Sequence, residues 1–396
     1  MNLKTSYLGI TFDNPFVLAS APPAADGDMI RRAFDAGWAG AVIKTLIREP
    51  VKNLGNRFAV TRRKGSIIGF ENLELLSERS PDDWFRTIGD LKTEFPDKVI
   101  IGSIMGDARS ADDWLSLARG CQEAGADLLE LNFSCPHGYP EKGRGATIGQ
   151  DPDYSAAITR WVTGCADIRI PVIPKLTAQV ADIQHIGEAV AGAGARGICA
   201  INTIPSLFGF DLKTLRPKPD IDGLTAYGGY SGAGIKPIAL RAVASLCQSP
   251  GLPVMACGGI GSGFDAVEFM LLGAPLVQVC TEVMLKGFGI IKGMQKDLAV
   301  FMKWHGFGRT ADLIGRCQYQ IVPFSALSPE ARYVAELVPD RCSSCGACHT
   351  ACRDGGYQAV TWDGGPPVFD AARCSGCSLC SHACPREAII MKKMAG

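Results

Sequence analysis

The chain has 396 residues, 47% of them hydrophobic, so it is long enough to bury one large core beside a second, smaller domain. Its 40 lysine and arginine residues balance its 40 aspartate and glutamate residues, so the charge indicates neither nucleic acid nor a membrane surface as its partner. The first residues do not read as a secretory signal and no stretch has the ~18 consecutive apolar residues of a membrane span, so we expect a cytoplasmic protein.

Up to about residue 300 the sequence alternates short, β-branched apolar runs with longer Ala-rich segments that have a polar face. Strand followed by helix is the repeating unit of parallel α/β architecture. The predicted strands are residues 16–20, 41–45, 99–105, 127–134, 172–177, 197–203, 253–259 and 276–281. Helices are expected between them, for example in "DMIRRAFDAGW" and "GFDAVEFMLLGA", and several end in a glycine where a C-cap belongs.

Eight such units are the number in a TIM (β/α)8 barrel, which is therefore the predicted fold. A doubly wound open sheet is the alternative, but it would usually carry a G-x-G-x-x-G turn after its first strand to hold a dinucleotide, and we expect no such motif anywhere in this chain. We assign residues 1–300 to the barrel, 301–335 to a helical, Pro-containing connector and 336–396 to a small cysteine-rich domain.

The cysteine-rich domain contains eight of the sixteen cysteines, in "CSSCGACHTAC" and "CSGCSLCSHACP". Both runs have the C-x2-C-x2-C-x3-C spacing of bacterial two-cluster ferredoxins, in which three thiolates of a run hold one [4Fe-4S] cluster and the fourth holds the other. The predicted ligand sets are Cys342, Cys345 and Cys348 with Cys384, and Cys374, Cys377 and Cys380 with Cys352. Zinc is the alternative, but its four ligands come in two separated pairs and would leave half of these cysteines unexplained.

Polar and Gly-rich segments follow the predicted strands, at the face where TIM barrels carry their active sites. The stretches "YGGYSGAGIKP", "ACGGIGSG" and "VCTEVM" are suited to phosphate, because glycine lets the backbone approach it closely. One Gly-rich turn is often merely a turn, whereas three on one face indicate a phosphorylated cofactor. The polar residues after the earlier strands are Lys44, Thr45, Asn132, Cys135, Lys175, Asn202 and Thr203.

Lys44 and Lys175 are expected to lie near that cofactor. A buried lysine is costly unless it meets an anion, and a reduced flavin carries negative charge at its N1/C2 carbonyl edge. The alternative is a lysine at the barrel mouth whose ammonium group reaches solvent.

The segments "LELNFSCPHG", "IPKLTAQVADI", "AINT", "YGGYSGAGIKPIALRAV", "GGI" and "QVCT", followed by the doubled cysteine tail, resemble the pyrimidine-reducing part of the dihydropyrimidine dehydrogenases, such as the bacterial NAD-dependent enzymes. They resemble the dihydroorotate dehydrogenases more distantly. The resemblance covers essentially the whole chain. It implies an FMN-containing barrel, with a ferredoxin-like domain holding two [4Fe-4S] clusters, that reduces the 5,6 double bond of uracil or thymine in pyrimidine catabolism.

The resemblance also implies roles for individual residues. The implied pyrimidine contacts are Asn72 and Glu74 of "FENLELLS", together with Asn132, Asn202 and Thr203. The implied FMN contacts are Ala19, Ser20, Lys44, Thr45, Lys175, Ser231, Gly232, Gly258, Gly259 and Thr281. Asparagine suits the imide edge of a pyrimidine, because its amide both donates and accepts hydrogen bonds.

Cys135 follows the fourth predicted strand, and the resemblance implies that it is the general acid. Reduction of the ring requires hydride from the flavin N5 on one carbon and a proton on its neighbour. A thiol with a pKa of about 8.5 is mostly protonated at neutral pH and can supply that proton. Residues 136–152 are expected to form a lid over the substrate. The alternatives are that Cys135 is a small buried hydrophobe, and that His137 donates the proton.

Single-chain members of the family also contain an FAD domain and a nicotinamide site, for which this sequence shows no counterpart. We therefore expect a partner subunit that binds FAD, oxidises NAD(P)H and sends electrons through the clusters to FMN, in a hetero-oligomer that could include a barrel dimer. Two alternatives stay open. The substrate could be dihydroorotate or another cyclic unsaturated amide. Dihydroorotate has a carboxylate, so it predicts a Lys or Arg in the pocket besides the flavin contacts. A non-catalytic electron-transfer subunit predicts that Cys135→Ala leaves activity unchanged, where proton donation predicts a loss on the order of a hundredfold or more.

Overall fold

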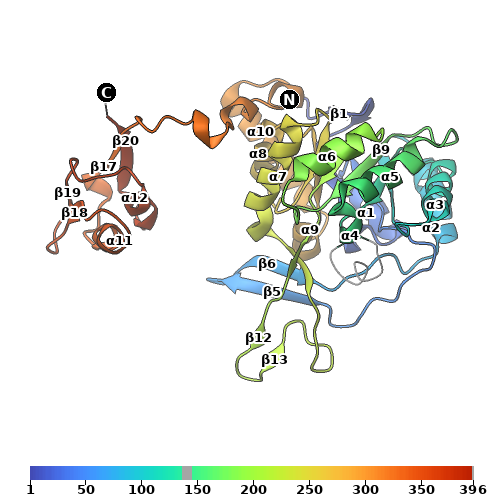
Figure 1. Ribbon diagram of the computed structural model, residues 1–396, viewed down its shortest axis with the longest axis horizontal. Coiled ribbons are helices and arrows are strands. Elements are labelled where there is room, and N and C mark those ends of the chain that lie inside the picture. Colours follow the sequence, from blue (N-terminus) through green and yellow to red (C-terminus); the bar gives the residue numbers. More distant parts are fainter. Residues whose placement is uncertain (136–144, 395–396) are drawn as a thin grey trace. The chain divides into compact units, whose positions relative to one another are not determined.

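The computed structural model describes residues 1–135 and 145–394 of the chain (Figure 1). The chain divides into two compact units, Met1–Ile321 and Val322–Gly396, and each is described by itself.

The larger unit is a closed barrel of eight parallel strands, in the order β10-β15-β16-β3-β4-β7-β8-β9. These strands are β3 (Phe16–Leu18), β4 (Gly40–Val42), β7 (Val99–Ile104), β8 (Leu128–Asn132), β9 (Val172–Leu176), β10 (Ile198–Ala200), β15 (Val254–Cys257) and β16 (Leu276–Val279). Each overlaps one of the eight runs predicted from the sequence, and only β4 begins outside its run, by one residue. The predicted TIM barrel is therefore confirmed and the open sheet is excluded.

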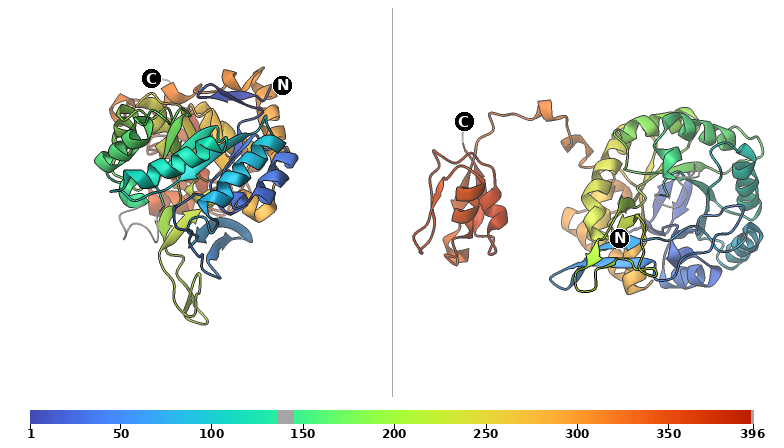
Figure 2. Two further views of the ribbon diagram at one scale, coloured as in Figure 1. Left: turned by 90° about the vertical axis from the view of Figure 1, so that its right-hand side faces the viewer. Right: turned by 60° about the horizontal axis from the view of Figure 1, so that its bottom comes forward.

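Helices surround the barrel, as Figure 2 shows in its right-hand view. They are α1 (Gly27–Ala36), α2 (Pro81–Glu94), α3 (Ala111–Glu123), α4 (Ala146–Gly149), α5 (Pro152–Thr163), α6 (Ile183–Gly192), α7 (Lys236–Gln248), α8 (Gly263–Leu271), α9 (Thr281–Lys286) and α10 (Ile290–His305). Local signals set several of their ends. The Asp26 side chain caps α1, Ser262 and Asp265 form a capping box on α8, and α1 stops at Gly37, which has a φ of 115°.

The barrel interior is layered. Successive residues of a strand point to opposite faces, so every second residue of each barrel strand points inward and contributes to a layer. The hairpin of β1 (Thr5–Tyr7) and β2 (Ile10–Phe12) contributes Tyr7 and Phe12 to a buried apolar cluster inside the barrel. The barrel strands add the apolar side chains Val17, Val42, Ile101, Leu128, Ile173, Cys199, Met255 and Leu276 to the same cluster. The residues two positions further along four of these strands form a polar layer above it, consisting of Ser103, Glu130, Lys175 and Gln278.

A second sheet, in the order β11-β14-β6-β5, is built from the connections between barrel strands. Its strands are β5 (Phe58–Arg63), β6 (Ser66–Asn72), β11 (Ile204–Ser206) and β14 (Gly228–Ser231). The hairpin of β12 (Phe210–Asp211) and β13 (Arg216–Pro217) projects beyond it in Figure 1. We predicted none of these strands from the sequence, although "FAVTRRKGSIIGF" has the length and the central glycine of a hairpin.

The barrel unit extends past residue 300, where we expected it to end. Helix α10 runs across that position, and its side chains Met294, Leu298 and Met302 are buried in the main core of the barrel unit. Three short 3-10 turns follow, at Thr310–Asp312, Gln318–Gln320 and Phe324–Ala326. The expected connector of residues 301–335 is therefore divided between the two units.

The lid expected over residues 136–152 is described only in part. Of the expected lid, residues 136–144 lie outside the described residues, and residues 146–149 and 152 belong to helices α4 and α5. A G-x-G-x-x-G sequence does occur in the chain, at residues 192–197, contrary to the expectation that the chain carries no dinucleotide motif. It lies between the end of α6 and the start of β10, the reverse of the strand-to-helix turn that binds a dinucleotide.

The smaller unit is built from two similar halves. Strand β17 (Tyr333–Leu337) pairs antiparallel with β20 (Ile389–Lys393), and β18 (Val360–Thr361) pairs with β19 (Val368–Phe369). The two helices, α11 (Ala347–Gly355) and α12 (Leu379–Ala383), each begin within a C-x2-C-x2-C-x3-C run. Their packing brings the two cysteine runs together around one small core that includes Cys348 and Cys380.

Candidate active site

A cavity of about 510 Å³ lies at the carboxyl ends of the barrel strands. Every predicted pyrimidine, FMN and proton-donor residue lines it. These residues are Ala19, Ser20, Lys44, Thr45, Asn72, Glu74, Asn132, Cys135, Lys175, Asn202, Thr203, Ser231, Gly232, Gly258, Gly259 and Thr281. Parallel strands end at the same edge of a barrel, which is why positions so far apart in sequence converge here.

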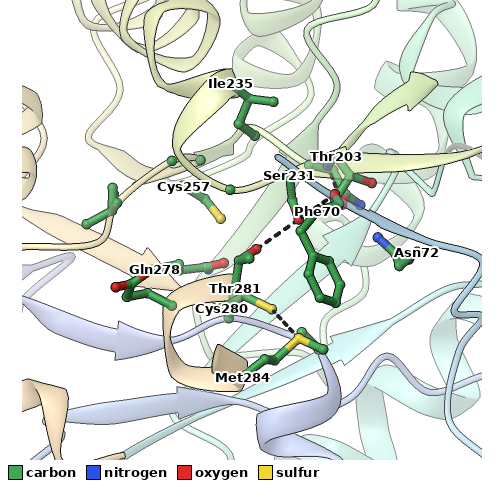
Figure 3. A pocket seen from close by; sticks show the side chains of 18 of the residues that line it. Phe70, Asn72, Thr203, Ser231, Ile235, Cys257, Gln278, Cys280, Thr281 and Met284 are labelled. Carbon is green, nitrogen blue, oxygen red and sulfur yellow. Dashed lines mark hydrogen bonds between the residues drawn. The ribbon is translucent and has the colours of Figure 1, made fainter. Parts of the chain in front are cut away.

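The loops after β14, β15 and β16 form one wall of the cavity. Ser231 Oγ and Thr281 Oγ1 lie 2.8 Å apart and join two of these loops (Figure 3). Gly258 and Gly259 have φ values of 125° and 75°, and a Cβ atom on Gly259 would lie 2.6 Å from the Cβ of Lys236. Glycine backbone and hydroxyl groups together are suited to the phosphate of FMN.

Three asparagines approach the cavity from different elements, and internal hydrogen bonds hold their amides. Asn72 Nδ2 donates to Gly229 O at 2.9 Å. Ser134 Oγ donates to Asn132 Oδ1 at 3.1 Å and accepts from Asn202 Nδ2 at 3.0 Å, so one serine orients two amides. An amide nitrogen has two N–H groups. Each of the three amide nitrogens has one described partner, which for Asn132 is Thr45 Oγ1. The group can therefore bind a planar imide.

Lys44 lies against the carboxylate of Glu74. Its Nζ donates to Glu74 Oε1 at 3.0 Å, and less than a tenth of either side chain is exposed. Burial lowers the pKa of Lys44, and the charge of Glu74 opposes that effect. Arg57, which we did not predict, binds the other oxygen of Glu74. The structure thus links a predicted flavin contact to a predicted pyrimidine contact.

Lys175 forms a separate buried network with two residues that we also did not predict. Its Nζ donates to Gln278 Oε1 at 2.7 Å and lies 3.6 Å from Glu130 Oε1. Burial is the largest single effect and by itself would lower the pKa of Lys175, but the surrounding electrostatic interactions, of which that with Glu130 is the largest, together raise the pKa. A lone polar residue inside an apolar strand, as in "LLEL" and "LVQV", is the sequence signal that could have identified Glu130 and Gln278.

Two further lysines line the cavity among the described residues, and both are paired. Lys236 Nζ lies 2.7 Å from Asp265 Oδ1 and also binds Glu268, and Lys286 binds Glu282. Lys236 packs beside Gly259, and Lys286 ends the helix that begins at Thr281, so both follow the loops suited to phosphate.

Cys135 lines the cavity with 5% of its surface exposed. It follows β8 by three residues, and its carbonyl oxygen accepts a 2.9 Å hydrogen bond from Ala146 N. Ala146 is the first residue of α4, so this bond links the backbone of Cys135 to the helix that follows residues 136–144 in the sequence. The alternative donor, His137, lies outside the described residues.

An apolar wall, which we did not predict, faces the polar groups. The side chains come from β5, β6 and the segment after them and are Phe58, Ile67, Phe70, Leu75 and Leu76. The rings of Phe58 and Phe70 pack with their centroids 5.3 Å apart. Cys257 and Cys280 also line the cavity, and burial raises the pKa of Cys280 to about 12, so this thiol stays protonated at neutral pH.

The cysteines of the smaller unit fall into two groups. Cys342, Cys345, Cys348 and Cys384 line one pocket, with the fourth cysteine coming from the second run. Cys380 interacts electrostatically with Cys352, Cys374 and Cys377. The structure therefore brings together the two crossed sets that we predicted.

Backbone amides support the two crossing cysteines in the same way. Ala359 N donates to Cys352 Sγ and Ala388 N donates to Cys384 Sγ, both at 3.3 Å. Within the described residues no group of three or more His, Cys, Asp or Glu side chains is arranged to hold a single metal ion. A [4Fe-4S] cluster does not require its ligands to surround a single ion, because each thiolate binds a different iron atom of the cluster.

The fold and the two sites define an oxidoreductase with FMN in a barrel and two [4Fe-4S] clusters in a ferredoxin-like unit. Residues 2–302 match the dihydroorotate dehydrogenase family and residues 335–391 match the 4Fe-4S dicluster domain. The chain belongs to the dihydroorotate dehydrogenase family. None of the described helices is long and apolar enough to span a membrane.

Three relatives show which members of that family the chain is similar to. It is 35% identical to the NAD-dependent dihydropyrimidine dehydrogenase subunit PreA of Escherichia coli, over 97% of this chain and 94% of that one. It is 37% identical to the chloroplastic dihydropyrimidine dehydrogenase (NADP(+)) of Arabidopsis thaliana, over 79% and 76%. It is 36% identical to the catalytic subunit of dihydroorotate dehydrogenase B (NAD(+)) of Pyrococcus furiosus, over 80% and 99%.

Proposed function

We propose that this chain is the pyrimidine-reducing subunit of an NAD-dependent dihydropyrimidine dehydrogenase and reduces the 5,6 double bond of uracil or thymine. Identity alone does not separate this substrate from dihydroorotate, because all three relatives are 35 to 37% identical to the chain. Coverage is more informative, since the similarity to PreA extends over 97% of the chain and that to the dihydroorotate dehydrogenase over 80%. The observation that carries the proposal is the group of three oriented asparagines in the cavity that Cys135 also lines.

The cavity residues fit FMN at both ends. Ser231, Gly232, Gly258, Gly259 and Thr281 would hold its phosphate end, and Lys44 and Lys175 would lie at its ring. FMN, when bound, supplies the hydride for the reduction.

The asparagines would bind the pyrimidine by its amide edges. Uracil presents alternating C=O and N–H groups, and Asn72, Asn132 and Asn202 offer matching donors and acceptors. Ser134 fixes two of these amides, so little side-chain freedom is lost on binding. A site built in this way discriminates strongly against analogues that lack one of the paired groups.

Cys135 would supply the proton. Its thiol gives a proton to one carbon of the double bond while the neighbouring carbon receives hydride, and the resulting thiolate is reprotonated before the next turnover. Because only 5% of Cys135 is exposed, water competes little for this position.

Among the residues that the structure describes, the charges in the cavity favour a neutral ring over a carboxylated one. Orotate and dihydroorotate carry a carboxylate that calls for a cation beside the ring. Lys236 and Lys286 reach the cavity, but each is paired with carboxylates and lies by the loops suited to phosphate.

The clusters imply a separate source of electrons. We propose that Cys342, Cys345, Cys348 and Cys384 hold one cluster and that Cys352, Cys374, Cys377 and Cys380 hold the other. A partner subunit with FAD would oxidise NAD(P)H and pass electrons to these clusters one at a time. We also propose a cytoplasmic location for the complex.

The test uses the purified chain with FMN and clusters bound. The protein is reduced with dithionite without oxygen, mixed with uracil, thymine or orotate, and followed by the return of oxidised-flavin absorbance. We expect uracil or thymine to reoxidise the flavin and to yield the 5,6-dihydropyrimidine, while NADH alone does not reduce the chain. Rapid reoxidation by orotate and none by uracil would contradict the proposal, and rapid reduction by NADH would remove the need for the partner.

A further inference from the structure

Glu130 is a fully buried carboxylate that the reaction as described does not use. It lies on β8, two residues before Asn132, and 0% of it is exposed. Glu130 does not line the cavity, whereas Lys175 and Gln278 do. An ionised carboxylate is costly to bury, so its partners indicate what it does there.

Those partners come from four strands, and one of them is the thiol of Cys199 on β10. Ser103 of β7 lies 3.5 Å from Glu130 Oε1, Lys175 of β9 lies 3.6 Å from the same oxygen, and Gln278 of β16 donates its Nε2 to Oε2 at 2.7 Å. Strands β7 and β9 flank β8, but β16 is four strands away in the eight-stranded barrel and so lies on the opposite side. The bond from Gln278 to Glu130 therefore crosses the barrel interior.

This bond determines how the amide of Gln278 is turned. A carboxylate accepts hydrogen bonds and cannot donate them, so Glu130 must receive the Nε2 end of the amide. The Oε1 end is then presented to Lys175 Nζ, which donates to it at 2.7 Å. Glu130 thus acts on Lys175 in two ways, through its own negative charge and through the orientation of Gln278.

The surroundings make this link hard to replace. Below the polar layer lie the apolar side chains Leu128, Ile173 and Leu276, and Met255 Sδ lies 3.1 Å from Gln278 Nε2. Above it lies the cavity, into which Lys175 extends. The floor of the cavity is therefore a charged layer held on an apolar base.

We propose that Glu130 is a positioning residue that keeps Lys175 protonated and directed at the flavin, acting through its charge and through Gln278. Its effect is on the balance between the two redox states of FMN, because an ammonium group beside the ring favours the anionic reduced form over the neutral oxidised form. The inference rests on the proposed contact between Lys175 and FMN, but on no particular pyrimidine.

The test measures the midpoint potential of bound FMN in the whole chain with its clusters, for wild type and Glu130→Gln. This substitution keeps the shape of the side chain and removes its charge. We expect the preference for reduced over oxidised FMN to fall at least tenfold, which is a shift of about 30 mV to a more negative two-electron potential. In a Lys175→Met background, which should itself shift the potential, Glu130→Gln is expected to add little.

The matched control is Glu71→Gln. Glu71 is also 0% exposed and lies outside the cavity lining, but it is held by Ser206 Oγ and Phe208 N and not by a lysine. We expect this variant to leave the flavin potential within a few millivolts of wild type, which separates a specific effect from a general loss of packing.

Three results would overturn the inference: an unchanged potential in Glu130→Gln, an equal shift in Glu71→Gln, or an unchanged potential in Lys175→Met. If Glu130→Gln yields no folded protein, Gln278→Met tests the same link, because it removes the oriented amide and keeps both charges. We expect a smaller shift in the same direction, and no shift would again refute the link. Reoxidation of the same samples by uracil reports on the proposed function separately.

Discussion

Gly259 gives a sharp test of the wall that we assign to the phosphate of FMN. Its φ of 75° lies in the left-handed region, where a side chain costs roughly 1 to 2 kcal/mol. In Gly259→Ala the new Cβ would also lie 2.6 Å from Lys236 Cβ and 2.7 Å from Lys236 N, at the start of α7. Overpacking of this kind costs a further ~1 to 3 kcal/mol, so the loop or α7 must shift.

Because the loop and α7 both border the cavity, a shift of either should weaken FMN binding. We expect the free energy of unfolding to fall by about 2 to 5 kcal/mol in total, and the Kd for FMN to rise at least tenfold. Chemical denaturation of the apoprotein measures the first quantity, and quenching of FMN fluorescence on binding measures the second.

Gly209→Ala is the matched control. Its φ is 81°, but a Cβ there would meet nothing within 4 Å, so it carries the backbone strain without the clash. We expect it to lose only ~1 to 2 kcal/mol of stability and to bind FMN like wild type. If Gly259→Ala also bound FMN like wild type, the reasoning that places the phosphate against this loop would be refuted.

Three further predictions concern the thiols and a buried acid. Cys135→Ala should slow reoxidation of the reduced flavin by uracil on the order of a hundredfold or more. The control Cys121→Ala, in a fully buried site on α3, should not slow it. Equal rates in both variants would contradict proton donation by Cys135. Cys352→Ser should lose one cluster, so iron analysis should find about half of the wild-type iron, and a full complement would argue against the crossed ligand sets. Burial raises the pKa of Glu71 above its ordinary value of 4.5. Just above pH 4.5 the native state therefore binds more protons than the unfolded state, so the stability of the protein falls as the pH rises. Denaturation between pH 4.5 and 7 should therefore show a smaller decline in Glu71→Gln than in wild type, and parallel curves would show that Glu71 does not cause it.

Most of the barrel could be predicted because its signals are local. Each strand is a short apolar run, and several helices carry their own N-caps, such as Asp26 and Ser262, within eight residues of the strand before them. Many of the cavity residues followed from the same rule, since polar side chains at the ends of parallel strands must meet at one edge. Asn72 and Glu74 were assigned from the resemblance alone, because β6 is not a barrel strand. The second sheet was missed because β6 pairs with β14, more than 150 residues away, and short strands in connections have no periodic pattern of their own.

The sequence by itself therefore determined the barrel, the cysteine spacing of the clusters and the residues that meet at the strand ends. Only the tertiary structure decided what lies beneath and beside them. Glu130 and Gln278 are 148 residues apart and touch because closure of the barrel places their strands opposite one another. Arg57 reaches Glu74 for a similar reason, since a hairpin folds back over the cavity. Such partners cannot be predicted from a local sequence pattern. The role of a polar residue in an apolar strand can be assigned only when its neighbours across the barrel are known.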